Sequence, residues 1–335
     1  MMSAEHRPKL TSAEMANLWT SYQNDTAAIC VFHHFLATVE DKETREILEY
    51  ALHLSQQHVK TLKEIMEGDH FPIPLGFSEQ DVNVSAPRLF SDEFYLSYMK
   101  NLAQIGVSSN SMAQSNSSRS DIRKFYTKCS YSSAELLNKI VSLLQRKGIY
   151  IRPPYIPVPT QVEFVHKQSF LTGWFGDRRP LNTVEIMNLF FNLQRNAIGN
   201  SLFMGFAQVA KSDEIQSYFQ RGKEIAIKHM EIFSSILKED DLPAAQTWDT
   251  EVSSSTISPF SDKLMMFHAL SLNSTGIGYY GISMGTSQRR DLGMMYARLM
   301  TEVTQYAEDG ANIMINHSWL EQPPTAPDRA ALVKN

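Results

Sequence analysis

The sequence predicts an all-α protein made of two tandem four-helix bundles. Two observations lead to this prediction. The segment Leu10–Leu18 (LTSAEMANL) returns as Leu181–Leu189 (LNTVEIMNL), and further matches continue over long gapless spans, so the chain is an internal duplication. Within each copy, helical patterns are joined by short loops except in the middle, where a connection of about 20 residues separates two helical pairs.

Each copy opens with the same signal for a helix start. Thr11 stands three residues before Glu14, and Asn182 stands three residues before Glu185. This is the spacing of a capping box, in which two side chains satisfy backbone N–H groups at a helix N-terminus. Apolar residues then recur at helical spacing, which predicts a long helix to Glu40 and its equivalent in the second copy.

The remaining helices of the first copy are predicted from residues that cap helix N-termini and from glycines and prolines that end helices. Asp41 can cap a second helix, whose apolar rhythm ends near Gly68, where a glycine and then prolines stop it. A third helix is expected after Ser91, and a fourth from about Arg119 to Gly148. The second copy repeats these patterns.

Connection lengths predict the topology. Only a few residues join the first helix to the second and the third to the fourth, so each pair should be an antiparallel hairpin. The stretches Asp69–Phe90 and Asp240–Pro259 can cross a helix of about 40 Å from end to end. The second and third helices can then run parallel, which is the one-crossover connection of ferritin-like bundles. We expect bundles over residues 10–150 and 181–322.

Residues 151–180, between the copies, are rich in proline and aromatic residues. The prolines exclude a continuous helix. Tyr155, Phe164, Phe170, Trp174 and Phe175 make the segment too aromatic for a solvated tether. We therefore expect it to pack across both bundles.

Charge and composition argue against several classes of partner. The net charge of the 335-residue chain is −5 at pH 7 with no sustained Lys/Arg stripe, which disfavours nucleic acid and a polybasic membrane contact. The N-terminus has no apolar signal region, and no run of about 18 apolar residues occurs, so we expect a cytoplasmic protein. Cys30 and Cys129 are expected to be small buried residues.

The metal site of ferritin-like bundles is incomplete in this sequence. A di-iron site needs a carboxylate from each of two helices and a Glu-x-x-His motif from each of the other two. His58 and His229 lie in mid-helix where such histidines would stand, but Ser55 and Ala226 replace the glutamates three residues earlier. We therefore predict no cofactor.

A reduced site for a transition metal stays open as the alternative. Its candidate ligands are the residues that neighbouring helices could bring to the two histidines, namely Asp25 and Glu135 for His58, and His268 with Glu302 or Glu308 for His229. The other interpretation is that both histidines are core residues with hydrogen-bond partners.

Several segments resemble a known family, the proteins of unknown function DUF3231 of spore-forming bacilli. They include FPIPLGF, SAPRLFSDEF, KGIYIRPPYIPVP, GWFGDRRPLN and YAEDGANIMI. The resemblance covers nearly the whole chain as two copies and implies a ferritin-like fold. Members often carry the label of spore-coat proteins, but the resemblance implies no established activity.

Two functions from different classes remain open. The first is a non-enzymatic structural or interaction protein, with association to the spore coat as one form of it, whose partners would be other proteins or further copies of itself. The second is a metal-binding or redox protein with a reduced site at the mid-helix histidines. The missing ligands and the family resemblance favour the first.

Overall fold

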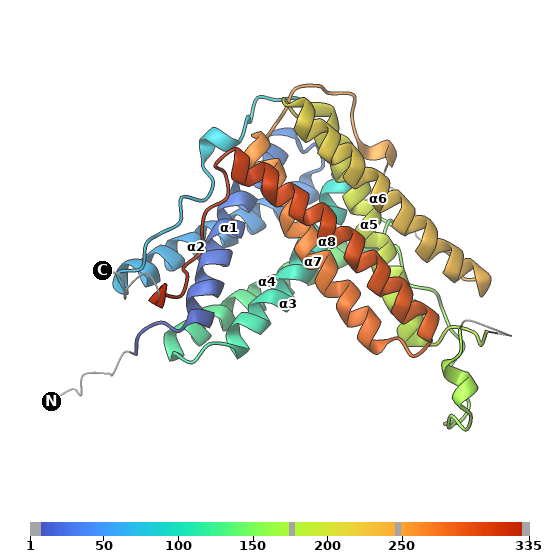
Figure 1. Ribbon diagram of the computed structural model, residues 1–335. Coiled ribbons are helices and arrows are strands. Elements are labelled where there is room, and N and C mark those ends of the chain that lie inside the picture. The colour runs from blue at the N-terminus through green and yellow to red at the C-terminus, as the bar shows by residue number, and fades with distance from the viewer. Residues whose placement is uncertain (1–7, 174–177, 245–248, 330–335) are drawn as a thin grey trace.

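The computed structural model describes residues 8–173, 178–244 and 249–329, which form eight long α-helices and contain no named strand (Figure 1). The first copy comprises α1 (Ser12–Thr38), α2 (Lys42–Gly68), α3 (Asp92–Ser115) and α4 (Ser120–Arg146). The second comprises α5 (Thr183–Val209), α6 (Asp213–Glu239), α7 (Asp262–Thr286) and α8 (Arg290–Asn316). The all-α prediction and the tandem arrangement are confirmed. None of the described helices combines the length and the apolar character that a membrane span requires.

The predicted capping boxes are present at the starts of α1 and α5. The Thr11 hydroxyl accepts the N–H of Glu14 (3.2 Å), and the Glu14 carboxylate accepts the N–H of Thr11 (2.7 Å). Asn182 and Glu185 repeat the arrangement. Glu14 also accepts the N–H of Arg119 (2.8 Å) at the start of α4. Each box therefore joins the start of the first helix of its copy to the start of the fourth.

The long crossovers leave the second and third helices of each copy parallel, as predicted. Asp92, at the start of α3, accepts the N–H of Asp41 at the start of α2 (2.8 Å), so both helices begin at the same end. Lys147, just after α4, donates to the Asp41 carboxylate (2.9 Å), which makes α4 antiparallel to α2. In the second copy the N–H of Lys211 donates to Asp262 (3.2 Å) and shows the same relation between α6 and α7.

An approximate twofold axis relates the two copies. Val82 forms an isolated antiparallel bridge with Phe260, and Phe90 forms one with Val252. Val252 is the repeat of Val82 and Phe260 is the repeat of Phe90, so each bridge is the symmetry mate of the other. This is the pattern of an isologous dimer interface, here within one chain.

Tyr98 and His268 lie on this axis. They are equivalent positions of the repeat, 170 residues apart, and the Tyr98 hydroxyl lies 3.0 Å from Nε2 of His268. A residue can contact its own equivalent only where the symmetry axis passes between the two. The contact therefore places the axis at the centre of the interface between the copies.

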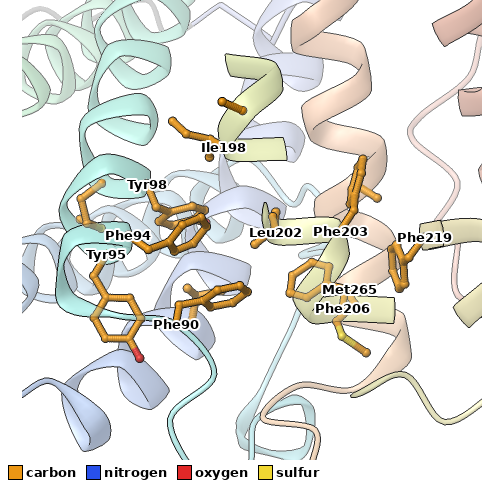
Figure 2. Packing of buried hydrophobic residues seen from close by; sticks show 14 of the residues in the cluster. Phe90, Phe94, Tyr95, Tyr98, Ile198, Leu202, Phe203, Phe206, Phe219 and Met265 are labelled. Atoms are coloured by element: carbon orange, nitrogen blue, oxygen red, sulfur yellow. The ribbon is translucent and has the colours of Figure 1, made fainter. Parts of the chain in front are cut away.

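One hydrophobic core runs through both copies. It includes side chains from all eight helices, and a smaller separate cluster surrounds Leu18 at the far end of the first copy. Figure 2 shows Phe90 and Phe94 of the first copy on one side of the interface and Leu202 and Phe206 of the second on the other. Because the copies share this core, each supports the packing of the other.

The segment between the copies is largely exposed, which corrects the expectation that it packs across both bundles. Ile156 contacts the core, but Tyr155 is 82% exposed and Phe164 is 77% exposed. Prolines hold this backbone extended, and most of its side chains reach no neighbouring surface. Trp174 and Phe175 lie outside the described residues.

Candidate functional site

A cavity of about 810 Å³ lies inside the first copy. It is bounded by α1 to α4, by α7 of the second copy and by the segment that follows α8. That segment returns to the first copy (Figure 1), where the Glu321 carboxylate accepts the N–H groups of Leu75 (2.9 Å) and Gly76 (2.8 Å). The volume lies within the range of about 300–1,000 Å³ typical of small-molecule sites.

The wall of this cavity is mainly apolar and carries polar side chains from several helices. Its apolar residues include Trp19, Phe32, Leu54, Leu102, Leu136 and Phe267. Its polar residues include Asn24, Asp25, Ser55, His58, Ser109 and Asn110. This combination suits a ligand with an apolar body and few polar atoms.

His58 lies in this wall where α1, α2 and α4 meet. Its Nδ1 is 3.4 Å from Oδ1 of Asp25, and its ring packs edge-on against Phe125 with 6.1 Å between ring centres. Burial alone would lower the pKa of His58, but hydrogen bonds with Asp25 and Cys129 outweigh it and raise this pKa to about 10. His58 is therefore a cation at neutral pH, paired with the Asp25 carboxylate.

Cys129 is the partner of His58 that the sequence analysis missed. Since α2 and α4 are antiparallel and both have 27 residues, a residue at a given distance from the start of α2 faces one at that distance from the end of α4. His58 lies roughly four and a half turns from the start of α2, and Cys129 lies about as far from the end of α4. Counting turns after predicting the topology would have placed the thiol beside the imidazole.

Glu135, a predicted ligand, does not reach His58. It is exposed, and its carboxylate lies 3.3 Å from Nζ of Lys139 and interacts with Tyr50. Glu135 is about one and a half turns further along α4 than Cys129, which puts it opposite an earlier part of α2. Asp25 is thus the carboxylate that the described structure brings to His58.

His229, the equivalent histidine, has a different environment. It is fully buried, with Nε2 at 3.1 Å from Oε2 of Glu302 and Nδ1 at 3.0 Å from the Tyr280 hydroxyl. Glu302 therefore meets His229 as predicted, whereas Glu308 is exposed on α8. Burial lowers the pKa of His229, and Glu302 offsets this only in part. The ring is neutral, and both of its nitrogens have partners.

His268, also a predicted ligand, lies apart from His229. The helices α6 and α7 start at the same end, and His268 is nearer that end by about ten residues, or about 15 Å along the axis. It bonds to Tyr98 instead, and burial lowers the pKa of His268 to about 4. Its place on the symmetry axis indicates a role in joining the copies.

The histidine environments offer few metal ligands. Residues 8–173, 178–244 and 249–329 contain no group of three His, Cys, Asp or Glu side chains arranged to hold a metal ion. At His58 the neighbouring Asp25 and Cys129 side chains are not arranged with the imidazole as a metal-holding group of three, whereas zinc sites in proteins use three or four ligands. At His229 both ring nitrogens already have hydrogen-bond partners.

The equivalent cavity of the second copy is small, with a volume of about 90 Å³. Its lining residues are largely the repeats of those around the large cavity. Tyrosines occupy the space where the first copy has shorter side chains, with Tyr279 for Ser109, Tyr280 for Asn110 and Tyr306 for Leu136. The same arrangement of helices therefore exists with an open and with a filled interior.

Comparison with known families now identifies the repeat. The family model for proteins of unknown function, DUF3231, matches residues 2–162 and again residues 169–332. The chain belongs to the DUF3231 family. It therefore carries two DUF3231 units, and the large cavity lies in the first of them.

Other comparisons add little about this DUF3231 protein. No curated protein matches it. Among solved structures it is similar to a putative spore coat protein from Bacillus halodurans, with 18% identity and a TM-score of 0.41, over 45% of this chain and 98% of that one. A likeness of this size leaves the function to be argued from the chain's own residues.

Proposed function

We propose that this DUF3231 protein is a non-enzymatic binding protein whose first copy holds a small, mainly apolar molecule. The observation behind this proposal is the difference between the equivalent cavities, about 810 Å³ and about 90 Å³. Apolar side chains that face an unfilled space forgo the stabilisation that burial would give them. The second copy demonstrates that larger side chains can fill this space, so an occupant explains why the first copy leaves it open.

The pair formed by Asp25 and His58 indicates the chemistry of the occupant. The Asp25 carboxylate and the His58 imidazolium lie side by side in an otherwise mainly apolar wall. Together they can accept and donate a hydrogen bond, and their charges largely cancel. The occupant would thus be an apolar body with one hydroxyl, amide or similar neutral polar group beside this pair.

The protein as purified provides the first test. Native mass spectrometry of the full chain should show a small molecule bound with a stoichiometry of one per chain, and organic extraction should release it. If the protein is purified empty, a neutral apolar fluorescent probe such as N-phenyl-1-naphthylamine should bind saturably at one site. The proposal would be contradicted if the measured mass equals that of the chain alone and the probe does not bind saturably.

The metal-binding alternative is tested on the same protein. Metal content should be measured after purification without chelators, and melting temperatures should be measured with added iron, manganese or zinc. Binding stabilises the native state by mass action, so a resident metal would raise the melting temperature. Our proposal predicts no such rise. A rise that disappears in His58→Ala would favour the metal-binding function instead.

An association with the spore coat is the cellular setting that we propose, and the label carried by DUF3231 members supports it. Other proteins, or further copies of this chain, would be the partners there. In a sporulating bacillus, a fluorescent fusion of the full chain should collect on the forming spore. A uniform distribution through sporulation would contradict this setting without affecting the binding proposal.

A further inference from the structure

Two basic side chains lie together at the interface between the copies, Lys100 on α3 and Arg195 on α5. Lys100 is 6% exposed, and its Nζ donates to Oε1 of Gln194 (3.3 Å) and lies 5.4 Å from the centre of the Tyr150 ring. In the part of the chain that the structure describes, neither Lys100 nor Arg195 forms an ion pair with a carboxylate. Their recorded partners are amides and aromatic rings.

Arg195 is poorly satisfied for a guanidinium in a partly buried place. It lies 3.6 Å from the centre of the Tyr279 ring, and one terminal nitrogen donates to Oδ1 of Asn192 at 3.4 Å. Its Nε is buried and has no acceptor. Since a guanidinium carries five N–H donors, Arg195 retains donor capacity that the protein does not use.

The two positive charges also disfavour each other. Burial, together with the charge of Arg195, lowers the pKa of Lys100 to about 8. Burial lowers the pKa of Arg195 as well. Buried charges of one sign without a counter-ion are costly, because they lose hydration and repel one another. An anion beside Arg195 would reduce this cost for both groups.

Arg195 lines the 90 Å³ cavity of the second copy, which has room for such an anion. Since about 10–15 Å³ of this kind of volume accommodates one water molecule, the space can hold a group of several heavy atoms. The amides of Asn101 and Asn273 also line it. A Cβ built on Gly199 or Gly276 would meet no atom within 4 Å, so the wall is open at both positions.

The approximate symmetry shows that this charge is not needed to join the copies. The repeat of Lys100 is Leu270, and Arg195 is the repeat of Asn24. The symmetry-related region, around α7 and α1, therefore forms the same kind of interface with two uncharged residues. Packing of the duplicated fold does not explain why two cations gather on one side only.

We propose that Arg195 binds a small oxyanion, a carboxylate or phosphate group, in the cavity of the second copy, and that the nearby charge of Lys100 strengthens this binding. The planar fork of the guanidinium matches two oxygens of such a group, and the ammonium adds a second charge. Arg195 and Lys100 do not line the proposed apolar ligand site, although the two cavities share Ile105, Leu272 and Thr275, and the anion proposal does not rest on the apolar ligand.

Calorimetric titration of the full chain tests the proposal, with sodium phosphate and sodium acetate as probes against sodium chloride at constant ionic strength. Phosphate or acetate should bind saturably, once per chain. Arg195→Gln should weaken the affinity about tenfold or more, since it removes charge-assisted hydrogen bonds. Lys100→Gln should weaken it in the same direction. Arg221→Gln is the matched control, because Arg221 pairs with Asp309 on the surface (2.7 Å) and should leave binding unchanged.

Melting temperatures separate binding from folding. Without added anion, Arg195→Gln should melt no lower than the parent, because the substitution removes an unpaired cation. Phosphate or acetate should raise the melting temperature of the parent more than chloride does and should lose this effect in Arg195→Gln. Absence of saturable binding of both anions to the parent would overturn the proposal. Equal affinity in the parent and in both variants would also overturn it.

Discussion

In the first copy α1 to α4, together with α7 and the segment after α8, border a space of about 810 Å³, whereas the equivalent cavity of the second copy measures about 90 Å³. The helices differ little in length, since α1 and α5 have the same length, as do α2 and α6 and also α4 and α8. Side chains make the difference, with tyrosines in the second copy at positions of shorter residues in the first. The repeated fold is therefore compatible with either interior, and a few side chains account for much of the difference in volume.

The environments of the two equivalent histidines differ in the same way as the two interiors. His229 is fully buried between Tyr280 and Glu302, while His58 lies in the cavity wall beside Asp25. Tyr280 fills the space in the second copy and also satisfies the histidine there. Its counterpart in the first copy, Asn110, instead donates to Ser133 (3.2 Å). Tyr280 thus contributes both to the filled cavity and to the hydrogen bonding of His229.

The largest effect is expected from opening the second copy. Tyr280→Asn copies the residue of the first copy and should destabilise the protein by about 3–5 kcal/mol, because it leaves a cavity and removes a partner of His229. Urea unfolding measures the change. The matched variant Asn110→Ala in the first copy should cost less than about 1 kcal/mol. Equal losses at the two positions would contradict the distinction between a filled and an open interior.

A smaller effect is expected from removing the histidines. His229→Ala should cost about 1–3 kcal/mol through a cavity and unpaired Glu302 and Tyr280 groups, whatever metal is present. His58→Ala should cost less, since His58 already borders open space. Thermal unfolding of both variants, with and without added metal, gives the comparison. A greater loss for His58→Ala would show that the first copy depends on its histidine more than packing explains.

The third difference between the copies lies in the pH dependence of stability. The pKa of His58 is raised from 6.5 to about 10, so its stabilising effect is complete below pH 6.5 and is lost as the pH rises towards 10. The pKa of His229 is lowered, so its contribution is present above pH 6.5 and is lost as the pH falls below it.

Denaturant unfolding of the parent, His58→Gln and His229→Gln between pH 5 and pH 10 would display these opposite trends. The stability difference between the parent and His58→Gln should shrink as the pH rises above neutrality. The difference for His229→Gln should instead shrink as the pH falls into the acidic range. The same slope for both variants would contradict the assignment of one charged and one neutral imidazole.

Local signals made much of the fold predictable from sequence. The caps at Thr11 and Asn182 and the crossover lengths depend on short-range spacing, and both survive in the structure. Helix neighbours were partly predictable too, since Asp25 and Glu302 do meet their histidines. The predicted contact between Glu135 and His58 was wrong because Glu135 lies on the correct helix, α4, but too far along it to reach His58.

The cavity itself could not be predicted. Its volume depends on how side chains from several helices and a distant C-terminal segment fill one space. The total volume of these side chains cannot be deduced from the periodicity of the sequence. The repeat did hold a usable signal. At aligned core positions the second copy has Tyr279 and Tyr280 where the first has Ser109 and Asn110. The larger side chains of the second copy at these positions indicate that the interiors of the two copies differ in volume.

Exchanging these residues tests the central claim most directly. The double variant Ser109→Tyr/Asn110→Tyr gives the first copy two of the three tyrosines that fill the second. Binding of the neutral apolar probe N-phenyl-1-naphthylamine to the parent and to this variant should be measured by fluorescence titration of the full chains. The account predicts that the single saturable site of the parent is lost in a variant that melts no lower than the parent. Unchanged affinity and stoichiometry in a folded variant would contradict the claim that the cavity of the first copy is the binding site.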